Sequence, residues 1–294
     1  MNPADVDRVR REFAAQIERE ANIRSSGLIN GLSIIPREHF VGPGPWKLLR
    51  PSRIDSGYET TPDDDPVHLY DTVLVALDPT RGLNNGEPSS LLRFLDVLDL
   101  APGDRFLHIG CGVGYYTAIA AQAVLPTGKV VGVELDSELA ERPKHNLRPY
   151  ENVDVICGDG NQPLAGAFDA TFVNAGTTEI RQWWLDQLAE GGRLLVFLTV
   201  AFPNDGSAVF SQAGRGYTLL VTRRGDRYAA RFVSPVAVFH CTGARDSASE
   251  QLLEEAFKNE GQADVRSLRQ DRHDLNAECW LHTSGFCLSR LGVD

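Results

Sequence analysis

The chain has 294 residues and a formal net charge of −11, with 29 Lys and Arg against 40 Asp and Glu. Hydrophobic residues make up 42% and charged residues 23% of the sequence. These values are typical of globular proteins and exclude a disordered or collagen-like chain. An acidic chain lacks the basic surface that non-specific binding to nucleic acid or to anionic membranes requires, so we expect neither partner.

The sequence predicts a cytoplasmic protein. The segment MNPADVDRVRREF at the start is charged and contains no apolar stretch typical of a secretory signal. The longest apolar run, Leu194–Phe202, is far shorter than the roughly 20 residues that a membrane-spanning helix needs. The cysteines are an odd number without a C-x-x-C pair, so we expect five free thiols in a reducing compartment.

Residues 1–87 are expected to form an N-terminal helix and a substrate or lid region. Val6, Val9, Phe13 and Ile17 recur at helical spacing, which predicts an amphipathic helix. Residues 31–90 are irregular and rich in Pro, Gly and Asp. An irregular stretch of this length within a compact domain is usually functional.

The pattern becomes regular from residue 88, where a helix is predicted to begin at Pro88. Short apolar runs then alternate with helical segments, and this alternation predicts an α/β fold with a doubly wound, mostly parallel sheet in residues 88–241. Residues 242–294 are expected to be a C-terminal extension. The predicted strands are 105–109, 129–133, 153–157, 170–174 and 193–197, and the predicted helices between them are 115–125, 137–147 and 180–188.

A glycine-rich turn, Gly110-Cys111-Gly112-Val113-Gly114, follows the first predicted strand and precedes a helix. Glycines there let the backbone approach a ligand closely, at the edge of the sheet where open α/β folds bind ligands. A dinucleotide site requires G-x-G-x-x-G, but Tyr115 stands where its third glycine would be. The spacing therefore disfavours a nicotinamide-dependent oxidoreductase, and it resembles motif I of S-adenosylmethionine (AdoMet) methyltransferases.

Two acidic residues follow the next two strands. Glu134 ends the run Val130–Glu134, and a carboxylate there can accept hydrogen bonds from both hydroxyls of a ribose. Asp159, followed by Gly160, comes after the third strand and can accept from an adenine amino group. The predicted cofactor-binding residues are His108, Gly110, Cys111, Gly112, Gly114, Tyr115, Glu134, Leu135, Asp159, Gly160 and Asn174.

Longer segments resemble the protein-L-isoaspartate O-methyltransferase family. Residues 35–41 resemble its PREHFV segment, and residues 100–115 resemble its LKPGDRVLEIGTGSGY segment. Residues 168–175 and 188–194 are similar to its YDAIIVTAA and LKPGGRLV segments. The resemblance covers about residues 33–241. It implies a class I, Rossmann-like methyltransferase fold, AdoMet as cofactor, and methyl transfer to a carboxylate of an isoaspartyl protein or peptide.

The sequence departs from this family where the acceptor is handled. The GQTIS loop of the family corresponds to Gly82–Gly86, so that Gly86 stands at the position of the serine. His108 replaces the usual acidic residue before Ile-Gly, and the residues beyond the matched region have no counterpart in the short bacterial enzymes. The acceptor therefore stays open between an isoaspartyl residue and another carboxylate in a peptide or small metabolite.

Transfer of a methyl group to a carboxylate needs no general base, because the acceptor is already anionic near neutral pH. Positioning and exclusion of water supply the acceleration. Asn84, Asn85 and Ser89 are the candidate catalytic donors that would hold the carboxylate, beside a helix N-terminus near Pro88. An alcohol or amine acceptor would need a base, and the candidates in that case are His39, His68 and Tyr70.

Two further readings remain at this point. A protein that keeps the fold and binds AdoMet without turnover would carry the same motifs. Cys279, His282 and Cys287 could suggest a metal, but on a regular strand His282 points away from both cysteines, so we predict no metal site.

Overall fold

The computed structural model describes residues 3–52, 57–202 and 213–293. The chain forms two compact units, which are described separately. The first contains Met1–Phe106 and Cys111–Gly158, and the second contains Leu107–Gly110 and Asp159–Asp294. Strand β5 (Arg105–Ile109) is divided between them. Among the described helices, none combines the length and apolar character needed to span a bilayer.

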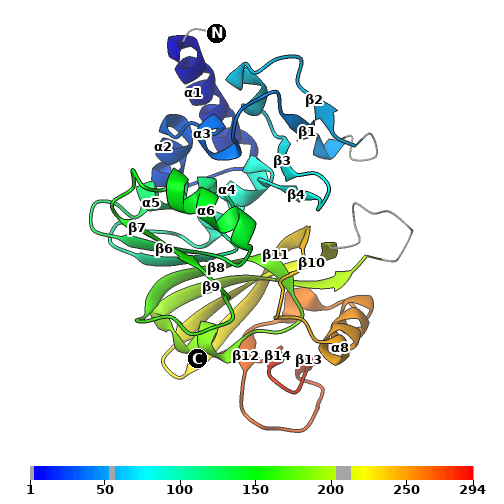
Figure 1. Cartoon of the computed structure of the whole chain (residues 1–294). Helices are drawn as coiled ribbons and strands as arrows, with labels where there is room; N and C mark the ends of the chain where they lie inside the picture. The colour runs from blue at the N-terminus through cyan, green and yellow to red at the C-terminus, as the bar shows by residue number, and fades with distance from the viewer. Residues whose placement is uncertain (1–2, 53–56, 203–212, 294) are drawn as a thin grey trace. The chain divides into compact units, whose positions relative to one another are not determined.

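Helices dominate the first unit (Figure 1). The predicted N-terminal helix is confirmed, and it buries Val6, Phe13 and Ile17 on one face. A second helix after it was not predicted, although Ser25 caps it by accepting a hydrogen bond from Leu28 N–H. The helices are α1 (Pro3–Glu20), α2 (Ser26–Ile34), α3 (Glu38–Val41), α4 (Pro88–Val97), α5 (Tyr115–Ala123), α6 (Ser137–Asn146) and the 3-10 helix η2 (Pro66–Leu69).

The first unit also contains two sets of paired strands. One is a four-stranded sheet in the order β2-β1-β3-β4, which buries a small apolar cluster including Trp46, Leu69 and Val73. The expectation of an irregular segment at 31–90 is therefore wrong in part, because these short strands carry too few residues to show an alternating pattern. The strands are β1 (Lys47–Leu49), β2 (Glu59–Thr60), β3 (Leu74–Asp78), β4 (Leu83–Asn84), and the parallel pair β6 (Lys129–Glu134) and β7 (Val153–Cys157).

The second unit is mainly sheet. Its strands follow the order β13-β14-β12-β11-β10-β9-β8, and β8 and β9 are parallel. The strands are β8 (Phe168–Thr177), β9 (Leu188–Ala201), β10 (Ala213–Arg224), β11 (Arg227–Phe239), β12 (Ser267–Arg269), β13 (Cys279–His282) and β14 (Cys287–Ser289). The helices are α7 (Gln182–Asp186), α8 (Ser247–Lys258) and the 3-10 helix η3 (Gln262–Asp264).

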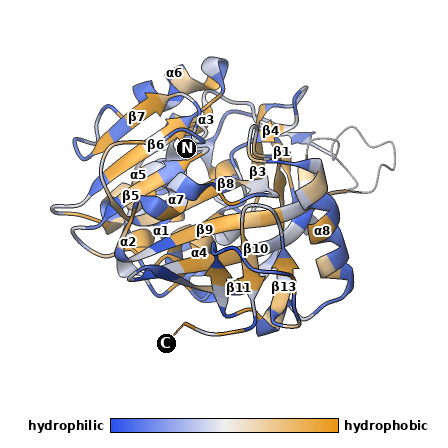
Figure 2. Ribbon diagram, turned by 90° about the horizontal axis from the view of Figure 1, so that it is seen from below, coloured by the Kyte–Doolittle hydropathy of each residue, from blue (hydrophilic) through white to orange (hydrophobic). Residues whose placement is uncertain are grey.

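The predicted α/β fold is confirmed, and the strands beyond β9 modify it. Strands β10 to β14 pair in antiparallel fashion. The two-residue turn Gly225–Asp226 between β10 and β11 requires this, because so short a connection can join only antiparallel strands. Strand β9 is hydrophobic along most of its length, as Figure 2 shows, and it is buried from Leu194 to Val200.

Candidate functional site

The glycine turn joins β5 to α5 with all three glycines in the left-handed region. The φ angles of Gly110, Gly112 and Gly114 are +76°, +57° and +90°, which side chains rarely adopt. A Cβ on Gly114 would lie 2.7 Å from Cδ1 of Leu147, so packing also requires glycine there. A Cβ on Gly112 would meet no atom within 4 Å. The backbone at Gly112 is therefore open to close approach by a ligand.

Glu134, the last residue of β6, is tied to this turn. Its Oε2 accepts a hydrogen bond of 2.7 Å from Gly112 N–H, and its Oε1 accepts one of 3.0 Å from Asp136 N–H. The residue is 8% exposed, and burial raises the pKa of its carboxyl above the ordinary value. Each oxygen accepts one amide hydrogen in these contacts and has a second lone pair. The carboxylate can therefore also accept the hydroxyls of a ribose.

The other predicted cofactor residues of the first unit differ in exposure. Cys111 is buried, its N–H donates to Val133 O at 3.0 Å, and burial raises the pKa of its thiol. Tyr115 is fully buried and packs edge-on against Phe40, with ring centroids 5.4 Å apart. Leu135 is 46% exposed, so it alone of the three presents an apolar surface to solvent or to a ligand.

In the second unit, Asp159 and Gly160 follow the end of β7. Asp159 Oδ1 accepts hydrogen bonds from the backbone N–H and the side-chain Nδ2 of Asn161, at 2.9 and 2.7 Å. The hydrogen bond from the Asn161 backbone is the main cause that lowers the pKa of Asp159. Gly160 accepts a hydrogen bond of 3.0 Å from Nε1 of buried Trp184, and a Cβ on Gly160 would lie 2.3 Å from Cγ2 of Ile109. This segment is fixed by packing and by hydrogen bonds.

His108 and Asn174 also belong to the second unit. His108 is 1% exposed, and its ring stacks on Phe172 with the centroids 5.3 Å apart. Burial lowers the pKa of His108 to about 3, so the imidazole is neutral at physiological pH. Asn174 Nδ2 donates to Gly110 O at 3.4 Å. The position of the ring indicates packing in the core, and contact between His108 and a cofactor stays a prediction.

The three candidate donors for a carboxylate lie around β4 and the start of α4. Asn84 Oδ1 accepts from Gly86 N–H at 2.8 Å, and Ser89 Oγ donates to Glu87 Oε2 at 2.8 Å. The Ser89 hydroxyl is therefore bonded to the carboxylate of Glu87, which caps α4 by accepting from the backbone N–H groups of Ser89 and Ser90. Asn85 is 7% exposed, and its Nδ2 has no hydrogen-bond partner within the described part of the chain. Asn85 is thus the candidate with an unused donor.

Arg37 holds this loop, and sequence reasoning gave it no role. It is fully buried, and its guanidinium donates to the carbonyls of Leu69, Val73 and Gly86 at 2.9, 2.9 and 3.1 Å. Gly86 O also accepts from the Tyr116 hydroxyl at 3.3 Å. The available signal was Arg37 itself within the segment 35–41, because a charge next to apolar residues suggests a buried anchor.

The side chains considered as bases for an alcohol or amine acceptor are either hydrogen-bonded within the protein or exposed to solvent. The Tyr70 hydroxyl donates to Glu38 Oε2 at 2.6 Å and accepts from Arg10 Nε at 2.9 Å, and burial raises the pKa of Tyr70. His68 Nε2 contacts Asp63 Oδ1 at 2.7 Å, and His39 is exposed. The hydrogen bonds and the raised pKa of Tyr70 therefore make it a poor base.

Comparison with known proteins decides the family. Residues 71–215 match the profile of the family described as protein-L-isoaspartate(D-aspartate) O-methyltransferase (PCMT). Protein-L-isoaspartate O-methyltransferase 1 of Archaeoglobus fulgidus is 34% identical over 197 residues, which cover 65% of this chain and 80% of that protein. The chain belongs to this family. It is an AdoMet-dependent methyltransferase.

Other PCMT relatives agree with this assignment. The protein-L-isoaspartate O-methyltransferase of Thermotoga maritima is 37% identical over 131 residues, covering 43% of this chain and 41% of that protein. A solved protein-L-isoaspartate O-methyltransferase superposes with a TM-score of 0.62 at 24% identity, covering 84% of this chain and 69% of that one, which confirms the fold.

The loop at Gly82–Gly86 is where this PCMT chain departs from the family segment. Gly86 has a φ of +68°, and a Cβ there would lie 3.0 Å from Cδ2 of Leu91. A serine at this position would be strained and crowded with the backbone as it stands. The backbone that Arg37 and Asn84 hold is therefore adapted to glycine.

Proposed function

We propose that this protein transfers the methyl group of AdoMet to the side-chain carboxylate of an isoaspartyl residue in a protein or peptide. Membership of the PCMT family supports the acceptor, since its curated relatives are named for it. The observation that carries the cofactor site is the hydrogen bond from Gly112 N–H to Glu134, which joins an open glycine turn to a buried carboxylate.

The residues present fit this cofactor. Gly110–Gly114 would let the amino-acid end of AdoMet approach the backbone closely at Gly112, Glu134 would hold the ribose, and Asp159 with Gly160 would hold the adenine. Among the remaining predicted cofactor residues, exposed Leu135 would contact the cofactor, and Asn174 would hold Gly110 through its hydrogen bond. The buried side chains of His108, Cys111 and Tyr115 would act through packing. When bound, AdoMet supplies a methyl group on a positively charged sulfur, which an oxygen of the acceptor takes as the carbon–sulfur bond breaks.

The chain has to position the acceptor and exclude water. The acceptor is ionised at neutral pH, so no proton has to move. Asn85 Nδ2 is the donor we assign to the carboxylate, because the hydrogen bonds of Asn84 and Ser89 hold the loop and the cap of α4. Arg37 acts as a positioning residue, since it fixes the backbone around Asn85.

A second candidate is a different carboxylate acceptor, in a peptide or a small metabolite. Gly86 favours it, because the family's serine hydroxyl is missing from this loop and the backbone is adapted to glycine. A cofactor-binding protein without turnover is the remaining alternative. We further propose a cytoplasmic location and the division into 1–87, 88–241 and 242–294, with the last part as an extension of the methyltransferase core.

The test is transfer of labelled methyl groups from AdoMet to an isoaspartyl peptide and to its aspartyl twin. Label on the isoaspartyl peptide alone, released as methanol by base, is the expected result. Label on neither peptide, with AdoMet binding intact, would favour another carboxylate acceptor. Asn85→Ala should raise KM for the peptide and leave AdoMet affinity unchanged, whereas Asn152→Ala, which removes an amide away from this loop, should change neither.

A further inference from the structure

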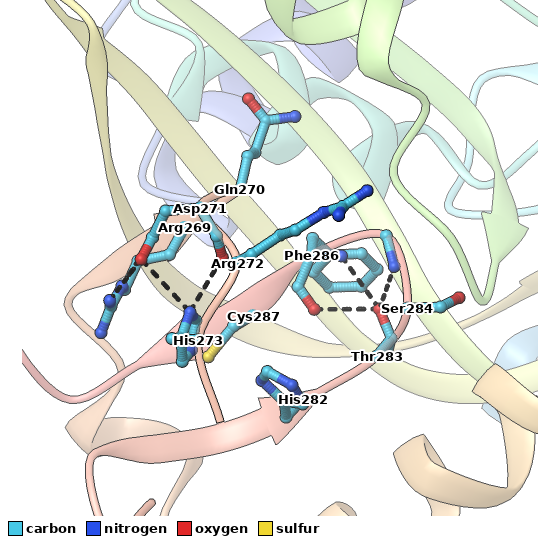
Figure 3. Close-up of a pocket in the computed structure, with 11 residues that line it drawn as sticks. Arg269, Gln270, Asp271, Arg272, His273, His282, Thr283, Ser284, Phe286 and Cys287 are labelled. Atoms are coloured by element: carbon cyan, nitrogen blue, oxygen red, sulfur yellow. Dashed lines mark hydrogen bonds and ion pairs between the residues drawn. The ribbon is translucent and has the colours of Figure 1, made fainter. Parts of the chain in front are cut away.

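Four side chains of the second unit form a cluster that the methyltransferase site does not use. His273, Cys279, His282 and Cys287 each offer one nitrogen or sulfur atom, and these atoms all lie within 4.8 Å of one another. Figure 3 shows three of them beside a pocket of about 200 Å³. Two thiols and two imidazoles at this spacing are a donor set that transition metals bind.

A β-bulge brings the strand residues of the cluster together. In the β13–β14 pairing, Cys279 faces Ser289 while Leu281 faces Leu288, so two steps on β13 oppose one step on β14. The extra residue shifts the alternation of side chains, which places Cys279 and His282 on one face. The orientation expected for a regular strand is therefore wrong. His282 is paired directly with Cys287, whose side chain lies on the same face.

His273 reaches the cluster from the loop between β12 and β13. Every residue from 271 to 278 is exposed except His273, which is partly buried. Its Nε2 lies 3.5 Å from Cys279 Sγ, close to the separation of about 3.5 Å expected between nitrogen and sulfur ligands of a tetrahedral zinc ion. The geometry of this contact suits two ligands of one ion.

The second nitrogen of His273 is also fixed. Nδ1 lies 2.9 Å from Asp271 O and 3.3 Å from its carboxylate Oδ2, and Arg269 pairs with the same carboxylate at 2.6 Å. A metal-binding histidine usually donates its other N–H to a carboxylate or carbonyl, which sets the tautomer. His282 provides a second, independent observation in favour of a metal site, because its Nδ1 is buried and has no hydrogen-bond partner within the described residues.

We propose that these four side chains bind one Zn²⁺ ion in a closed, structural Cys₂His₂ site. Zinc fits best because two thiolates and two imidazoles are a usual ligand set of tetrahedral structural zinc, with no position left open for catalysis. On binding, thiols that carry protons release them to solvent and the sulfurs coordinate the metal. The ion would fasten the largely exposed loop 271–278 to the β13–β14 hairpin.

Metal content of the full chain tests this proposal. The protein is purified under reducing conditions without a metal-affinity step, stripped with a chelator, and titrated with Zn²⁺ and separately with Co²⁺. We expect about one zinc per chain after gel filtration, and with Co²⁺ the intense visible bands of a tetrahedral thiolate site. This readout does not depend on methyltransferase activity.

Two variants locate the site. His273→Gln removes a ligand from an exposed loop without touching the core, and we expect zinc affinity to fall by more than about 100-fold. Asp271→Asn should cost about 10-fold, as loss of an outer partner does. The matched control His145→Gln changes an exposed histidine of the other unit and should leave the affinity unchanged.

Three outcomes would overturn the proposal. The first is folded protein that binds no stoichiometric zinc and whose thiols titrate as free. The second is an unchanged zinc affinity in His273→Gln. The third is a disulfide between Cys279 and Cys287, found by mass spectrometry in freshly isolated protein. Should Cys279→Ser fail to fold, His273→Gln still decides the question.

Discussion

Gly86→Ser restores the residue type of the family at the acceptor loop, and we expect it to destabilise the protein without improving transfer to an isoaspartyl peptide. The left-handed φ of +68° costs a residue with a side chain about 1–2 kcal/mol. The new Cβ would also lie 3.0 and 3.3 Å from Cδ2 and Cγ of Leu91, and overpacking of this kind costs about 1–3 kcal/mol.

The loop has little freedom to relax. Gly86 N–H donates to Asn84, and Gly86 O accepts from both Arg37 and Tyr116. We therefore expect the free energy of unfolding to fall by about 2–5 kcal/mol, the sum of the backbone and packing costs. Urea unfolding followed by circular dichroism measures this change.

Gly57→Ser is the matched control. Gly57 is in the same unit with a φ of +70°, and a Cβ there would meet nothing within 4 Å. The free energy of unfolding of Gly57→Ser should fall only by the cost of the left-handed backbone. This loss should be at least about 1 kcal/mol smaller than the loss in Gly86→Ser. Equal losses of stability would refute the packing argument, and a gain in isoaspartyl transfer without loss of stability would refute the view that the loop is adapted to glycine.

Three further outcomes follow from the same structure. Glu134→Gln should weaken AdoMet binding about 10- to 100-fold by calorimetry, because a charge-assisted hydrogen bond contributes about 1.5–3 kcal/mol. The same change at Glu141, an exposed residue of α6, should leave the binding unchanged. Arg37→Met should lower the free energy of unfolding by at least about 3 kcal/mol, since three carbonyls each lose a hydrogen bond from a charged donor. His108 binds a proton in the unfolded chain below its ordinary pKa of 6.5 but in the folded chain only below about 3, so folding stability should fall as the pH drops between these values. Replacement by Phe should make stability less dependent on pH in that window, and an unchanged slope would contradict the assignment.

The methyltransferase core could be predicted because each of its signals is local. The run 105–109 predicts β5 with the bounds that the structure has, and the glycines that follow it predict the tight turn into α5. The helix predicted at 180–188 is shorter, Gln182–Asp186, because β9 already begins at Leu188. Pairing of Leu188 with Phe168 of β8 decides that boundary, and the isolated segment carries no sign of it.

The acceptor loop and the C-terminal cluster could not be predicted in the same way, because both depend on contacts between distant segments. Arg37 acts on carbonyls 32 to 49 residues away, and a sequence pattern does not show which carbonyls a guanidinium will reach. At Cys279 and His282 one extra residue in a strand reverses the expected orientation of a side chain, since register has a period of two. An argument from the alternation of side chains along a strand therefore cannot detect a motif that spans a bulge. The Cys and His residues of the last 25 positions indicate a metal site only once the pairing of β13 with β14 is known.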